Sequence, residues 1–150
     1  MQAAWPNYMS QPPEIRVPRN DKFRLMTWVL YDIDAPNPYD RSESPYLHYM
    51  RANIACTSAA MSELCELGES HASEIEPFAR PDPSQNIPHS YYIEVFGHNQ
   101  PIHAEQERDF IQASGKANFD LPLFKRRNQL TTLYTGAFLA DGKSRPTKER

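Results

Sequence analysis

The stretch Met26–Asn53, MTWVLYDIDAPNPYDRSESPYLHYMRAN, decides the fold of this 150-residue chain. Its first part, Met26–Tyr31, is a nearly continuous apolar run of β-favouring residues, which predicts a strand buried on both faces. Asp32 and Asp34 follow directly, and Pro36 ends the strand because proline cannot donate a hydrogen bond to a β-ladder. The sequence therefore predicts two carboxylates at the end of a buried strand.

A second apolar run, Tyr46–Met50, follows a polar loop and carries His48, which we expect near the aspartates if the two strands are neighbours. The order of these features resembles the first signature of the phosphatidylethanolamine-binding protein family: Asp-Pro-Asp-Ala-Pro, a polar loop and Leu-His-Trp. The sequence differs from this signature at Ile33, which replaces the first proline, and at Tyr49, where Trp is common.

The second signature of the family, a proline followed by Gly-x-His-Arg-Tyr at the head of a strand, resembles the segment around residues 83–91. Pro83, His89 and Tyr91 match it, whereas Ile87 stands at the glycine position and Ser90 at the arginine position. Alternation along a strand places Tyr91 on the same side as His89. The resemblance extends from about residue 13 to residue 139.

The resemblance implies a mainly β (α+β) fold with a large central β-sheet packed against a smaller sheet and a few short helices. The 14 prolines against 5 glycines also favour loops and strand ends over long helices. We expect an N-terminal arm at residues 1–13, a domain at 14–140 with an insertion loop at 68–86, and a basic tail at 141–150.

Periodicity predicts the local structure between the two signatures and after them. Apolar residues at helical spacing predict a short helix over Ser58–Leu67, and an acidic segment favours another over Ala104–Phe110. Asp120 is a candidate cap for a third helix that ends in a basic run, and Thr131–Leu139 is typical of a last strand. His98, beside a proline loop, is expected to be solvated.

The resemblance implies one small anion pocket, in which imidazole and tyrosine groups bind a phosphate or a phospholipid head group while aspartates orient the imidazoles. Its candidate residues are Asp32, Asp34, His48, Pro83, His89 and Tyr91. Ser90 lacks the charge and the forked donors of an arginine. Two interpretations stay open, a weakened anion site and a structurally satisfied cluster in which Asp32 and His48 are partners.

No pattern in the sequence predicts catalysis. Asp32, His48 and Ser90 have the side chains of a hydrolase triad, but Ser90 has no Gly-x-Ser-x-Gly turn around it. Cys56 and Cys65, considered together with two histidines, lack the closely spaced ligand pairs of a zinc site. We therefore expect neither a catalytic centre nor a metal or other cofactor.

Charge and cysteine content limit the partners and the compartment. A net charge of −3 argues against general nucleic-acid affinity, although Lys125, Arg126 and Arg127 with the basic tail suit a local contact with phosphate backbones. Two cysteines without a secretory signal favour an intracellular location, cytoplasmic or organellar, including mitochondria. No apolar run has the roughly 20 residues of a membrane span.

These features predict a non-catalytic binding or scaffold module that acts through protein contacts. One form of this function is a structural subunit of a large particle, for which a divergent mitochondrial-ribosome subunit of the same family is a precedent. The alternative is an anion- or lipid-head-group-binding regulator of a signalling enzyme, of the kinase or protease inhibitor type. In the first form, contacts come from residues 1–13, 68–86 and 141–150, where the resemblance stops.

Overall fold

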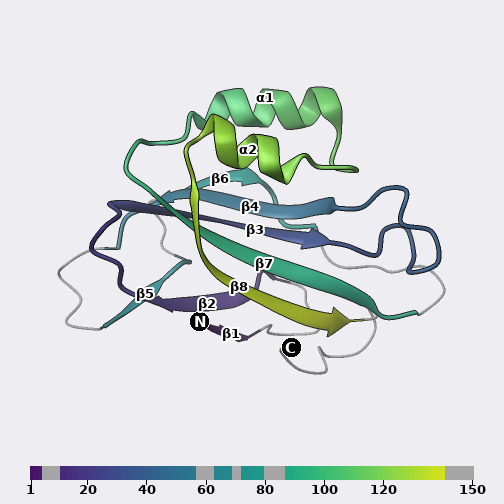
Figure 1. The fold of residues 1–150 in the computed structure, drawn as a ribbon, viewed down its shortest axis with the longest axis horizontal. Helices are drawn as coiled ribbons and strands as arrows, with labels where there is room; N and C mark the ends of the chain where they lie inside the picture. The colour runs from purple at the N-terminus through teal and green to yellow at the C-terminus, as the bar shows by residue number, and fades with distance from the viewer. Residues whose placement is uncertain (5–10, 57–62, 69–71, 80–86, 141–150) are drawn as a thin grey trace.

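The computed structural model describes residues 1–4, 11–56, 63–68, 72–79 and 87–140 of the chain. These residues form three layers (Figure 1), with a large sheet in the middle, a small sheet on one side and two helices on the other. The expected mainly β fold, with a large sheet packed against a smaller one and few helices, is confirmed.

Both sheets are antiparallel. The five-stranded sheet has the order β6-β4-β3-β7-β8, with β3 Leu25–Asp32, β4 Tyr46–Ile54, β6 Ser73–Glu76, β7 His89–His98 and β8 Thr131–Ala140. The three-stranded sheet has the order β1-β2-β5, with β1 Gln2–Ala4, β2 Glu14–Pro18 and β5 Leu64–Glu66. The helices are α1 Ala104–Ser114 and α2 Leu121–Arg127.

Burial on both faces explains the unbroken apolar run at the start of the deciding stretch. Trp28 and Leu30 of β3 belong to the core between the two sheets, whereas Val29 belongs to the core beneath the helices. Each such side chain contributes about 1.5–3 kcal/mol when fully buried. The strand is thus held from both sides, and its last residue, Asp32, is fixed at the end of the central layer.

The two helices form where the sequence predicts them. The N–H of Leu123 donates a hydrogen bond of 3.0 Å to Oδ1 of Asp120, which is therefore the cap of α2. Phe124 is buried, and its ring packs against those of Phe96 and Phe119. This contact holds α2 on the helical side of the large sheet.

The predicted helix over Ser58–Leu67 is wrong in the part that the structure describes. Leu64–Glu66 is the strand β5, in which Cys65 pairs with Val17 of β2, while residues 58–62 lie outside the described residues. Cys65 and Val17 both belong to the core between the sheets. Pairing with a distant strand therefore prevails over the weak helical spacing.

The expected arm and insertion loop also contribute strands. Gln2–Ala4 is β1 and pairs with β2, although residues 5–10 are not described. Within the insertion, Ser73–Glu76 is β6, which forms one edge of the large sheet and buries Ile75. The sequence Glu-Ile-Glu alternates as an edge strand does, and this short signal escaped the prediction.

The structure corrects the expectation for His98. His98 is buried rather than solvated, with Nε2 2.8 Å from Oγ1 of Thr27 and Nδ1 2.7 Å from the carbonyl oxygen of Gln100. Cys56 and Cys65 are free thiols, and Cys65 is buried. Neither of the described helices combines the length and the apolar character that crossing a membrane requires.

Candidate functional site

The two aspartates at the end of β3 have different partners. The N–H of Asp34 donates to Oδ1 of Asp32 at 2.8 Å, which folds the chain back immediately after the strand. Asp34 accepts a 2.7 Å hydrogen bond from the N–H of Ser90 and a 2.9 Å bond from Nε of Arg41. Both carboxylates are buried, and Asp34 thereby ties the end of β3 to the start of β7.

His89 opens β7 and pairs with Asp32. Its Nδ1 lies 2.7 Å from Oδ2 of Asp32, and the two side chains are only 3% and 6% exposed. A carboxylate only accepts hydrogen bonds, so Nδ1 of His89 carries the proton. Nε2 on the other side of the ring is buried and has no hydrogen-bond partner among the described residues.

His48 reaches the same region through a β-bulge. The register of β3 against β4 shifts between Leu30 and Tyr31, and His48 is the extra residue on β4. A bulge redirects a side chain that strict alternation would send elsewhere. The His48 ring lies 5.5 Å from the Tyr91 ring, and its Nδ1 donates to the carbonyl oxygen of Ala79 at 2.7 Å.

The structure thus brings most of the predicted residues together. Tyr91 lies between the two imidazoles, because its ring stacks on His89 with 6.2 Å between centroids and meets His48 edge-on. Asp32 joins this group through His89. Asp34 instead faces Ser90 and Arg41, and Pro83 lies outside the described residues.

The predicted partnership of Asp32 with His48 is wrong. The carboxylate bonds to His89, and His48 bonds to a backbone carbonyl. The physical reason is the register, which places Asp32 opposite Tyr91 of β7, two residues from His89 and on the same face of the sheet. The two candidate histidines therefore have separate partners.

Arg41 is a site residue that sequence reasoning missed. It lies in the polar loop after β3, where a lone arginine is usually solvated, and its side chain is 61% exposed even in the ion pair with Asp34. An arginine placed seven residues after a buried aspartate was the available signal. Arg41 supplies a guanidinium beside a site that lacks arginine at position 90.

The same geometry does not assemble the hydrolase triad or a metal site. Ser90 follows His89 along β7, so alternation directs its side chain to the opposite face of the sheet. His48 is held by Ala79 rather than by an aspartate. Within the described ranges, no three side chains of the ligating types lie close enough together to hold a metal ion.

Two of the three basic residues at the end of α2, Lys125 and Arg127, form ion pairs within the protein, so this run is not simply a solvated helix face. Lys125 donates to Thr132 at 2.6 Å and lies 3.4 Å from Oε1 of Glu94. Arg127 donates to Glu107 of α1 through both Nε and Nη2, at 3.1 Å and 2.5 Å. Only Arg126 of the three takes no part in the ion pairs of the described residues.

The structure is a sandwich of a large and a small β-sheet, with a buried carboxylate and two imidazoles at one end of the large sheet. Residues 5–144 match the sequence profile of the family described as phosphatidylethanolamine-binding protein. This match covers most of the chain, so the chain belongs to the phosphatidylethanolamine-binding protein family.

One solved structure with the same fold and one weaker match are similar to this chain. A carboxypeptidase Y inhibitor, solved in complex with its cognate proteinase, matches with a TM-score of 0.64 and 17% sequence identity, over 86% of this chain and 70% of the inhibitor. A phosphatidylethanolamine-binding protein homologue from Chlamydia trachomatis matches with a TM-score of 0.47 and 15% identity, over 80% of this chain and 72% of the homologue.

The burial of two histidines, His48 and His98, is expected to make the stability of the protein depend on pH. Burial lowers the pKa of His48 and of His98, and their hydrogen bonds to backbone carbonyls oppose that effect only in part. A lowered pKa means that the unfolded chain binds protons more readily, so stability is lost as the pH falls below the unfolded value of about 6.5. At pH 5.5, each imidazole is expected to remove up to about 1.4 kcal/mol.

Urea unfolding at pH 7.5 and 5.5 measures this loss. We expect His98→Gln to reduce the difference between the two pH values, and His103→Gln to leave it unchanged because His103 is exposed. An identical pH dependence of the parent and of His98→Gln would contradict the assignment of this loss to the buried His98 imidazole.

Proposed function

We propose that this protein is a non-catalytic binding module that acts through protein contacts, and that its anion pocket is weak. The main support is that hydrogen bonds within the protein already occupy most polar groups of the pocket. Asp32 and Asp34 accept from His89, Arg41 and two backbone N–H groups, and His48 is bound to a carbonyl. Polar groups that already have hydrogen-bond partners within the protein are not free to bind a ligand.

The remaining ligand-binding capacity is at Nε2 of His89. Because Nδ1–H of His89 donates to Asp32, Nε2 of the neutral ring is a hydrogen-bond acceptor. A phosphate or phospholipid head group, whose oxygens are mainly acceptors, would therefore bind weakly there. Without a guanidinium at position 90, such binding is expected to be about one to two decades weaker.

The second candidate function is regulation of an enzyme by a ligand-responsive inhibitor. Two observations favour it: the buried, unsatisfied Nε2 of His89, and the fold shared with an inhibitor bound to a proteinase. In this function the pocket would be the control point, and a kinase or a protease would be the partner. Phosphate occupancy of the pocket would then change the affinity for that partner.

The scaffold function places the contacts elsewhere. Segments 1–13, 68–86 and 141–150 lie at the ends of the family resemblance or where it fails, and the tail is rich in lysine and arginine. Such a protein suits a subunit of a large intracellular particle, a mitochondrial ribosome being one setting, with the tail and Arg126 against phosphate backbones. Trp5, Tyr8 and Met9 would serve as anchors on a protein partner. Phe78, expected to act with them, instead packs against the core between the sheets and against the ring of Tyr49.

Recovery of native partners from the source cells distinguishes the two functions. We compare the parent with a variant that lacks residues 141–150 and with His89→Gln, each first shown to be folded, and quantify the captured proteins by mass spectrometry. The scaffold function predicts that removal of the tail loses partners and that His89→Gln keeps them. If the tail-less chain keeps every partner and His89→Gln loses them, the ligand-regulated function replaces it.

Titration with phosphate and with glycerophosphoethanolamine at pH 5.5 and 8.0, followed by NMR, tests the pocket itself. We expect millimolar binding at best at either pH, and none in His89→Gln. Micromolar binding at pH 8.0 that His89→Gln abolishes would show that the pocket is a working ligand site and would overturn the view of it as weak.

A further inference from the structure

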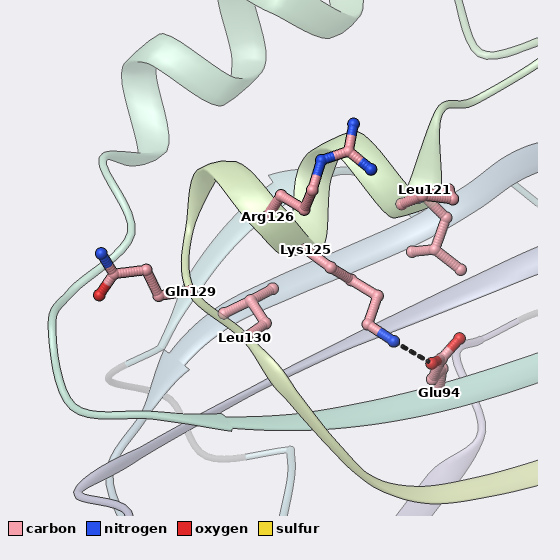
Figure 2. A pocket seen from close by; sticks show the side chains of 7 residues that line it. Glu94, Leu121, Lys125, Arg126, Gln129 and Leu130 are labelled. Atoms are coloured by element: carbon pink, nitrogen blue, oxygen red, sulfur yellow. Dashed lines mark hydrogen bonds and ion pairs between the residues drawn. The ribbon is translucent and has the colours of Figure 1, made fainter.

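A concave site lies on the opposite face of the large sheet from His89. It has a volume of about 530 Å³ and is formed by α2, the turn that follows α2 and the strand β7 (Figure 2). Residues of β7 alternate between the two faces, so Glu94 opens to the helical side while His89 opens to the small sheet. A volume of several hundred cubic ångströms is typical of small-molecule sites.

The walls of this site are apolar. Leu121 and Pro122 contribute the first turn of α2, and Leu130 contributes the turn into β8. Figure 2 shows Leu121 and Leu130 on two sides of Lys125, whose side chain runs down toward Glu94. A hydrocarbon group placed here would contact side chains from both ends of the helix.

The polar floor of the site is balanced within the protein. Glu94 is buried and accepts from the hydroxyl of Thr132 at 2.7 Å, with Lys125 and the hydroxyl of Tyr31 each 3.4 Å from its oxygens. Lys125 also donates to Thr132 and lies over the ring of Phe96. The floor therefore has no net charge to offer a ligand.

The rim is positively charged. Arg126 lines the site, is exposed and enters none of the ion pairs among the described residues. Its guanidinium lies on the outer side of α2 in Figure 2, and the Gln129 amide stands at the other end of the opening. With Lys125 and Glu94 cancelling, the charge that a ligand would meet is that of Arg126.

We propose that this site binds small amphipathic anions. The hydrocarbon body would lie against Leu121, Pro122 and Leu130, and a carboxylate or phosphate at its end would pair with Arg126. A guanidinium binds either anion through two parallel N–H groups. A cationic ligand is disfavoured, because Arg126 stands at the opening and the only carboxylate of the lining is already bonded.

The test is a titration of the ¹⁵N-labelled full chain with octanoate, followed by NMR. We expect shifts concentrated at residues 121–130 and at Glu94, and about tenfold weaker binding in Arg126→Gln, because a charged hydrogen bond is lost. Arg16→Gln is the matched control, since it makes the same charge change on the exposed face of β2 in the small sheet. Equal affinity of Arg126→Gln and Arg16→Gln would overturn the proposal.

Ligand controls separate the two parts of the anion. Octyl phosphate is expected to bind at the same residues as octanoate, acetate to bind at least tenfold more weakly because it lacks the apolar body, and octylamine to cause no shifts there. Shifts from octylamine equal to those from octanoate, or shifts from octanoate that are absent from residues 121–130, would refute the site. His89→Gln is expected to leave octanoate binding unchanged, so this outcome is independent of the phosphate pocket.

Discussion

Arg127→Ala is expected to lower the free energy of unfolding by about 3 kcal/mol, because it leaves a buried carboxylate without its charge partner. Glu107 of α1 is 6% exposed at its side chain and accepts both hydrogen bonds of the Arg127 guanidinium. Asn128 also donates to Glu107, at 3.2 Å, but carries no charge. Urea denaturation at pH 7.5 measures the loss.

Arg126→Ala is the matched control, since it removes the neighbouring arginine of the same helix. Arg126 is exposed, so its replacement is expected to change stability by no more than about 0.5 kcal/mol. Adding Glu107→Met to Arg127→Ala should recover much of the loss, because an apolar side chain of similar size does not require a charge partner. Equal stability of the Arg127 and Arg126 variants would refute the buried pair.

Asp32→Ala is expected to destabilise the protein by roughly 2–6 kcal/mol. The substitution leaves two buried donors, Nδ1 of His89 and the N–H of Asp34, without an acceptor, and each unsatisfied group costs about 1–3 kcal/mol. Asp21→Ala is the control, because Asp21 is exposed in the turn before β3. Thermal and urea unfolding of the three proteins give the comparison.

The Asp32 result also bears on function. If Asp32→Ala and Asp21→Ala were equally stable, the carboxylate would not be a structural partner of His89, and the view of the pocket as internally satisfied would fail. A large loss supports the proposal that the carboxylate and imidazole cluster is kept for the architecture of the sheet. Retention of phosphate binding by a folded Asp32 variant would show that the carboxylate does not orient His89 for ligand.

Local pattern was enough to predict the large strands and the helices. The run Met26–Tyr31 has the continuous apolar character that only a strand between two packed layers needs, and Asp120 with Pro122 marks the start of α2. The order of the signature residues was enough for the family and for the meeting of His48, His89 and Tyr91. These features depend on residues close together in the sequence or on motifs of fixed order.

Contacts between residues far apart in the sequence determined the features that the local sequence pattern did not predict. Register chose His89 as the partner of Asp32, and one extra residue in β4 sent His48 to Ala79. Contacts across the fold turned the segments around Cys65 and Ile75 into strands, because pairing to β2 and β4 satisfies their backbones. Glu94 is buried where α2 packs on the sheet, and Lys125 is its partner there. Glu107 is buried where α2 packs on α1, and Arg127 is its partner. Spacing along the chain does not predict these ion pairs, because their residues are 20 or more positions apart.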